Sequence, residues 1–121
     1  NQPSGVDGIV ILNGEGRQQG YSVGGSFDFN GDGFSDVIFG SPNSDPNGAI
    51  DAGAAFVLFG SYTPPETFST TGLNGNNGFE IHGASAGDFL GLSVASGGDF
   101  NGDGFDELLV GAAALPGFSV E

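Results

Sequence analysis

Cysteine, methionine and tryptophan are absent from this chain of 121 residues, and basic residues are almost absent. Without cysteine the chain can form no disulfide and offers no thiolate ligand to a metal. Arg17 is the only Lys or Arg residue, against 15 Asp and Glu residues, and the formal net charge is −14. Because so few positive charges are available to neutralise phosphates, we expect no nucleic-acid partner.

Long apolar runs are also missing. No stretch approaches the ~20 apolar residues of a membrane span, so we expect no membrane insertion. No basic start leads into an apolar run, and we therefore expect a signal peptide to be absent or already removed. No apolar period near 3.6 residues is found along the chain, which argues against helices.

Catalytic constellations are missing as well, so we expect no enzymatic activity. Ser22 and Ser93 recur at matched places, but no base is placed beside both, and we interpret them as strand residues. His82 is the only histidine and lies in a strand-like segment, so a packed or half-exposed strand residue is favoured over a metal ligand.

The chain does contain 25 Gly, 6 Pro and 12 Phe, which punctuate and fill short runs rich in Val, Ile and Leu. Such runs between Gly, Asn, Asp and Pro predict an all-β protein with many tight turns. Several runs are continuous rather than alternating, which indicates strands buried on both faces, as in stacked sheets. We expect loops over Asn43–Asp51 and Tyr62–Asn77.

An internal repeat organises these runs. The segment GYSVGGSFDFNGDGFSDVIFGSP begins at Gly20, and GLSVASGGDFNGDGFDELLVGAA begins at Gly91, an offset of 71 residues. Each is preceded by a further apolar piece, GIVILNG from Gly8 and GFEIHG from Gly78. The order strand, strand, acidic loop, strand therefore occurs twice.

The acidic loops, Asp28–Asp36 and Asp99–Glu107, carry the chemistry. Acidic and amide side chains recur at loop positions 1, 3, 5 and 9, and alternate residues of a tight loop can turn toward one point. Calcium prefers six to eight hard oxygen ligands in a flexible cage, and a backbone carbonyl at position 7 adds another. The ring at position 7 is then free to pack under the loop. We predict two bound Ca²⁺ ions, with the ligands Asp28, Asn30, Asp32, Phe34, Asp36, Asp99, Asn101, Asp103, Phe105 and Glu107.

Other interpretations of the loops fit less well. An EF-hand needs Glu at position 12, where this chain has Phe39 and Val110. Magnesium prefers fewer protein ligands and more water. Asx-Gly loops are also common turns without a metal, but two copies at matched places favour calcium. Glu107 is longer than Asp36 and either binds in a bidentate manner or distorts the second site.

The residues resemble FG-GAP repeats, the blades of the integrin α-subunit propeller and of many bacterial surface proteins. The resemblance rests on Gly20–Val23, Phe39–Pro42, Phe56–Gly60 and the two DFNGDG loops. It implies four-stranded antiparallel blades with calcium in the loop between the first two strands. Known propellers have about seven blades, whereas this chain holds about two repeats, and Ala113 replaces a frequent Pro.

The resemblance implies an organisation and a function. We expect residues 1–14 to be the outer strand of a preceding or neighbouring blade, 15–86 the first repeat, and 87–121 an incomplete second repeat. The implied function is a calcium-binding module of a secreted or cell-surface protein that mediates adhesion or recognises a protein or cell-surface ligand, without catalysis. Two alternatives stay open, a self-assembling structural subunit and an accessory domain of a surface enzyme.

The N-terminal strand carries the self-assembly alternative. Ile9–Leu12 matches the fourth strand of a blade, Phe79–His82, and fewer than two blades cannot close on themselves. We expect this strand to lack a fourth-strand role in its own chain and to pair with the second repeat of another copy. Such head-to-tail strand exchange produces a ring or a filament.

Overall fold

The computed structural model describes residues 10–12, 22–63 and 67–112. Several residues named above lie outside the described residues: Ile9, Arg17, Gly20 and the segment from Ala113 onward. Within them the chain is all-β, as expected, with two short 3₁₀ turns. Among these residues no helix has the length and apolar character needed to cross a membrane.

The first repeat forms a four-stranded sheet. Its strands are β2 (Ser22–Phe27), β3 (Asp36–Ser41), β4 (Ala54–Leu58) and β6 (Gly78–His82). The order is β2-β3-β4-β6, and every neighbouring pair is antiparallel. This confirms the expected four-stranded antiparallel blade.

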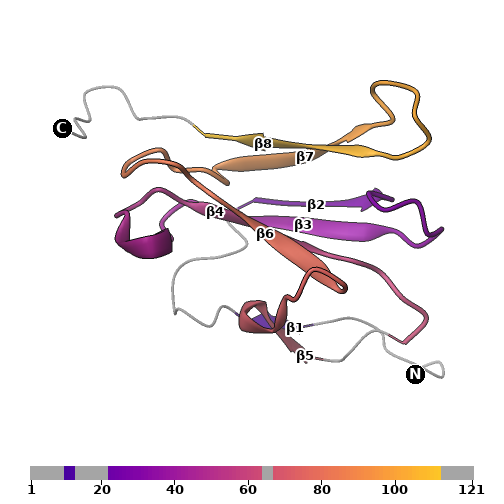
Figure 1. Ribbon diagram of the computed structural model, residues 1–121, viewed down its shortest axis with the longest axis horizontal. Helices are drawn as coiled ribbons and strands as arrows, with labels where there is room; N and C mark the ends of the chain where they lie inside the picture. The colour runs from indigo at the N-terminus through magenta and orange to yellow at the C-terminus, as the bar shows by residue number, and fades with distance from the viewer. Residues whose placement is uncertain (1–9, 13–21, 64–66, 113–121) are drawn as a thin grey trace.

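The second repeat begins a second blade. Strands β7 (Ser93–Gly98) and β8 (Glu107–Gly111) form an antiparallel pair, and each begins 71 residues after its counterpart β2 or β3. This hairpin lies over the β2–β3 side of the first blade in Figure 1. The side chains that pack against the blade core of Phe27, Ile38 and Val57 include Val94, Leu108 and Val110.

The first blade is covered on both faces. Every residue of β4 is buried, because Val57 faces the hairpin while Ala54 and Phe56 face the opposite side. On that opposite side Ile11 and Leu73 pack against the core. The expectation of two buried faces is therefore met in β4, but not in β8, where Leu109 is exposed.

Strand β1 (Val10–Leu12) departs from our expectation. It pairs in parallel with β5 (Thr67–Ser69), so the edge strand that we expected to be open has a partner in its own chain. The partner comes from Tyr62–Asn77, which we had expected to be a loop throughout. Thr and Phe in β5 favour extended backbone, and Ile11 gains burial against the blade, which together explain the pairing.

The two 3₁₀ turns also fall in expected loops. The turn η1 (Pro46–Gly48) lies in the first of them and η2 (Thr70–Gly72) in the second. Ser69 caps η2 by accepting a hydrogen bond from the Thr71 N–H. Both turns connect strands and leave the β architecture unchanged.

Candidate metal centres

The two acidic loops lie at the same end of the molecule, where β2 turns into β3 and β7 turns into β8 (Figure 1). In the first loop one carboxylate oxygen from each of Asp28, Asp32 and Asp36 lies within 4.8 Å of the others. In the second loop the same holds for Asp99, Asp103 and Glu107. Both predicted clusters of acidic residues are therefore assembled by the fold.

The side-chain carboxylate of Asp28 organises the first loop by accepting hydrogen bonds from backbone N–H groups of the loop. Its Oδ1 accepts a hydrogen bond from the Asp32 N–H at 3.1 Å, and its Oδ2 accepts one from the Gly33 N–H at 2.8 Å. Asp32 Oδ1 in turn accepts a hydrogen bond from the Phe34 N–H at 2.9 Å. Gly33 has φ of 90°, a backbone conformation that favours glycine, so the turn needs this residue at position 6.

Asp36 closes the loop from the sheet side. It is fully buried as the first residue of β3, where its Oδ2 accepts a hydrogen bond from Phe29 N–H and its Oδ1 accepts one from Gly60 N–H. Burial raises the pKa of its carboxyl group above the usual value, and the charges of Asp32 and Asp28 raise it further. The two N–H donors act in the opposite direction without cancelling the rise.

The second loop repeats this pattern. Asp99 accepts hydrogen bonds from the Asp103 and Gly104 N–H groups, at 3.0 and 2.9 Å, and Asp103 Oδ1 accepts one from Phe105 N–H at 3.0 Å. Glu107 Oε1 accepts a hydrogen bond from the Phe100 N–H, the counterpart of the Asp36–Phe29 bond. The longer side chain of Glu107 thus reaches the same backbone group as Asp36 does.

The other predicted ligands have less defined positions. Asn101 Oδ1 accepts a hydrogen bond from the Asp103 N–H at 3.3 Å, while Asn30 is exposed in the first loop. The carbonyl groups of Phe34 and Phe105 stay predictions as ligands. The N–H groups of these two residues donate hydrogen bonds to the position-5 carboxylates, Phe34 to Asp32 and Phe105 to Asp103.

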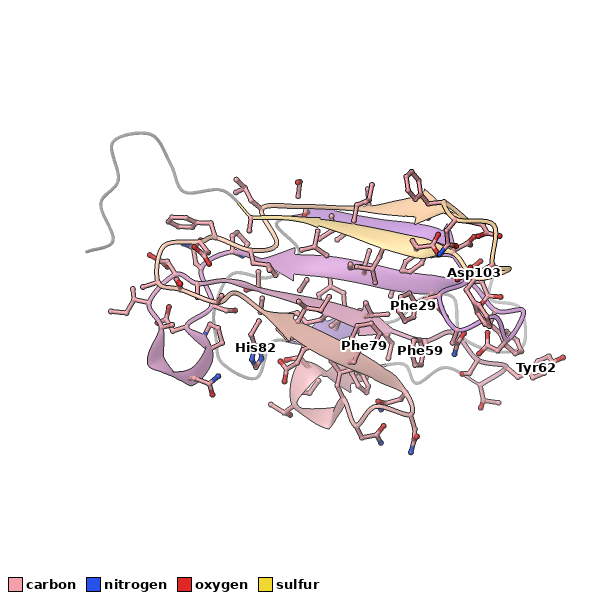
Figure 2. The ribbon with its side chains drawn as sticks, turned by 45° about the horizontal axis from the view of Figure 1, so that its top comes forward. Phe29, Phe59, Tyr62, Phe79, His82 and Asp103 are labelled. Carbon is pink, nitrogen blue, oxygen red and sulfur yellow. The ribbon has the colours of Figure 1, made fainter. Side chains whose placement is uncertain are left out.

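The aromatic rings differ from our expectation for position 7. Under the first loop lies the ring of position 2, Phe29, at 5.2 Å from Phe79 and 6.5 Å from Phe59 between centroids (Figure 2). The position-7 ring of Phe34 instead packs on Tyr62 in a T-shaped arrangement, with the ring centroids 4.6 Å apart. The ring at position 2, Phe29, therefore anchors the first loop to the blade through its contacts with Phe59 and Phe79.

The donor set of each loop fits a hard divalent cation. Each carboxylate oxygen has two lone pairs, so an oxygen that accepts one N–H group keeps capacity for a cation. Three carboxylates gathered within 4.8 Å also repel one another unless a cation lies between them. Oxygen ligands of this kind in a flexible loop suit calcium better than softer transition metals.

Asp106 is a site residue that our sequence reasoning missed. Its Oδ2 accepts a hydrogen bond from the Asp28 N–H at 2.8 Å, and its own N–H donates to the Asp28 carbonyl oxygen at 3.1 Å. The second loop therefore contacts the backbone of the first ligand of the first loop. The signal in the sequence is the difference at position 8, where the first loop has Ser35 and the second has Asp106.

The other polar residues considered above form hydrogen bonds or ion pairs that are typical of strands and loops. Ser22 Oγ donates a hydrogen bond to the Gly91 carbonyl oxygen at 2.9 Å, which links the blade to the second repeat. His82 Nε2 lies 3.2 Å from Glu80 Oε2, and both side chains are partly exposed. Asp51 accepts a hydrogen bond from Asn43, and its N–H donates to Asp45. These contacts support the interpretation of Ser22 and His82 as strand residues, and they place Asp45 and Asp51 in the hydrogen-bonded loop expected over Asn43–Asp51.

Comparison with known proteins agrees with this architecture. The model of the FG-GAP repeat family matches residues 19–58 and 90–117. Integrin alpha-PS2 of Drosophila melanogaster is 36% identical over 110 residues, covering 84% of this chain and 7% of that protein. The chain thus spans only a small part of the length of this relative. The two matched segments, the antiparallel blade and the repeated acidic loops place the chain in the FG-GAP repeat family of integrin-like β-propeller blades.

Proposed function

We propose that this chain is a calcium-binding propeller module of a secreted or cell-surface protein, and that it mediates adhesion or protein recognition without catalysis. The observation that carries calcium binding is the pair of carboxylate clusters, each within 4.8 Å, in two loops with matching hydrogen bonds. The relation to an integrin α subunit supports a cell-surface location and a protein ligand.

The proposed ligands keep the residues predicted from the sequence. In each loop the carboxylates at positions 1, 5 and 9 hold the ion, with the Asn side chain at position 3 and the carbonyl at position 7 completing the shell. Calcium bound there offsets two of the three negative charges and fixes the turn between two strands. The proposed division into residues 1–14, 15–86 and 87–121 follows the same repeat.

Calcium titration by isothermal calorimetry tests the proposal. We expect the wild-type chain to bind two ions with dissociation constants on the order of 10⁻⁴ M or weaker, as extracellular modules do. The double variant Asp28→Ala, Asp32→Ala removes two carboxylates of the first loop, so it should bind one ion. No binding by the wild type at millimolar calcium would overturn the proposal.

A matched control separates ligand loss from loss of charge. The double variant Glu80→Ala, Asp88→Ala also removes two carboxylates, but from outside both loops. Its far-UV circular dichroism should match the wild type, and it should still bind two ions. Loss of a site in this control would mean that net charge, rather than the loop geometry, governs binding.

A further inference from the structure

The two loops are in direct contact, and the residue that makes most of this contact, Asp106, is not one of the proposed ligands. Asp106 forms two hydrogen bonds with the backbone of Asp28, one through its carboxylate at 2.8 Å and one through its N–H at 3.1 Å. Together these bonds fix both sides of the residue that supplies position 1 of the first loop. A hydrogen bond to a carboxylate is stronger than one between neutral groups.

A second contact reinforces the first. The ring of Phe105 lies against Gly31, so close that a Cβ atom on Gly31 would lie 2.5 Å from Cε1 of the ring. The side chain of Phe105, in the second loop, therefore covers the backbone of the first loop at Gly31. Phe105 and Asp106 are adjacent, and they lie between Asp103 and Glu107, two members of the second cluster.

We propose that Asp106 is a positioning residue that couples the two metal centres, so that cation binding in the second loop strengthens cation binding in the first. The inference rests on the proposed calcium function. A cation that draws Asp103 and Glu107 together orders the segment between them, and that segment holds Asp28. Without the cation, three mutually repelling carboxylates loosen the same segment.

The sequence of the first repeat shows that this contact is not a general feature of the loop. Ser35 occupies the position of Asp106 and is exposed, and the ring of Phe34 packs within its own repeat on Tyr62. The contact runs from the second loop to the first, whereas the coupling in binding free energy is reciprocal by linkage. Either loop is therefore expected to bind more weakly when the other cannot bind.

Calcium calorimetry on six proteins, three with Asp106 and the same three with Asp106→Ala, measures the coupling. The double variant Asp28→Ala, Asp32→Ala gives the calcium affinity of the second loop alone, and the double variant Asp99→Ala, Asp103→Ala gives that of the first loop alone. The wild type gives the product of both affinities, including any coupling. Dividing the wild-type product by the two single-loop affinities gives a coupling factor. We expect about fivefold or more, and a factor near one when all three proteins also carry Asp106→Ala. A wild-type factor within twofold of one, or a factor unchanged by Asp106→Ala, would overturn the proposal.

Two further variants test the role of the Asp106 carboxylate. Asp106→Asn keeps an oxygen acceptor for the Asp28 N–H and should keep most of the coupling, whereas Ser35→Ala, the matched position in the first loop, should leave the factor unchanged. Circular dichroism at saturating calcium verifies the fold of each variant. Binding of two ions without coupling would overturn only this inference, whereas no binding would overturn the proposed function together with it.

Discussion

At the residue scale, Asp36 joins a structural role to a proposed ligand role. Its carboxylate is buried and bonded to the N–H groups of Phe29 and Gly60, which hold the start of the loop and the end of β4. The loop therefore closes around a group that water does not reach.

The raised pKa of Asp36 predicts a pH dependence of the metal-free protein. The folded state holds the proton of Asp36 more tightly than the unfolded chain, where the pKa is near 3.8. The stability gained from this proton is complete below 3.8 and is lost as pH rises through the folded-state pKa. In calcium-free buffer, the unfolding free energy of wild type relative to Asp36→Asn should therefore increase as pH falls from neutral toward 3.8.

Urea denaturation at several pH values measures this difference. The comparison with Asp36→Asn removes the general effect of a net charge of −14, which both proteins share apart from one carboxylate. With saturating calcium the sign should reverse, because the cation competes with the proton for the same oxygens. A difference that stays constant with pH in the absence of calcium would contradict the prediction.

At the element scale, the close approach of the two repeats depends on Gly40 in β3. A Cβ atom at this position would overlap the carbonyl oxygen of Gly91, which is the acceptor of the Ser22 hydroxyl. Because the obstacle is backbone, it cannot rotate away. We expect Gly40→Ala to lower the unfolding free energy by about 1–3 kcal/mol, as overpacking in a core does.

Gly25→Ala is the matched control for Gly40→Ala. Gly25 lies in the neighbouring strand β2, and a Cβ atom there would meet Val37 Cγ1 at an ordinary 3.8 Å. We expect its unfolding free energy to equal or exceed that of wild type, since replacing glycine restricts the unfolded chain. Equal urea midpoints for the two variants would show that the contact with Gly91 does not limit the packing.

The elements that the sequence predicts well are those defined by local pattern. The strands β3 and β8 follow from short apolar runs between turn residues, and β2 and β7 follow from the repeat that precedes each acidic loop. The two clusters follow from the spacing of carboxylates within nine residues. Tertiary contacts decide the rest. The parallel pairing of β1 with β5 depends on packing against the blade, and the Asp106 contact joins residues 78 positions apart.

At the scale of the whole molecule, the acidity of the chain makes its stability depend on cations. A net charge of −14 opposes compaction, and six carboxylates are concentrated in two clusters at one end. Calcium that binds only the folded state adds about 2.7 kcal/mol per site at a hundredfold excess over the dissociation constant. For a domain of this size that corresponds to a rise in melting temperature on the order of 10 °C.

Differential scanning calorimetry with calcium and with a chelator tests this expectation. Sodium chloride at equal ionic strength is the control, because it screens charge without filling the loops. The rise should require calcium and should shrink in the variant that lacks Asp28 and Asp32. A melting temperature that does not respond to the chelator would show that the clusters do not hold calcium in the folded state.

Among the described residues, the first blade has four paired strands and the second repeat has two, and this difference affects how that part of the chain opens. A two-stranded hairpin is marginally stable by itself, whereas the four strands of the first blade support one another. For the described residues we therefore expect the opening of lowest free energy to release β7 and β8 while the blade stays intact, as a separate cooperative unit. That excursion uncovers Ile38 and Val57 and frees Asp28 from Asp106. The lifetime of the docked hairpin thus sets how long the first loop keeps its closed shape between openings.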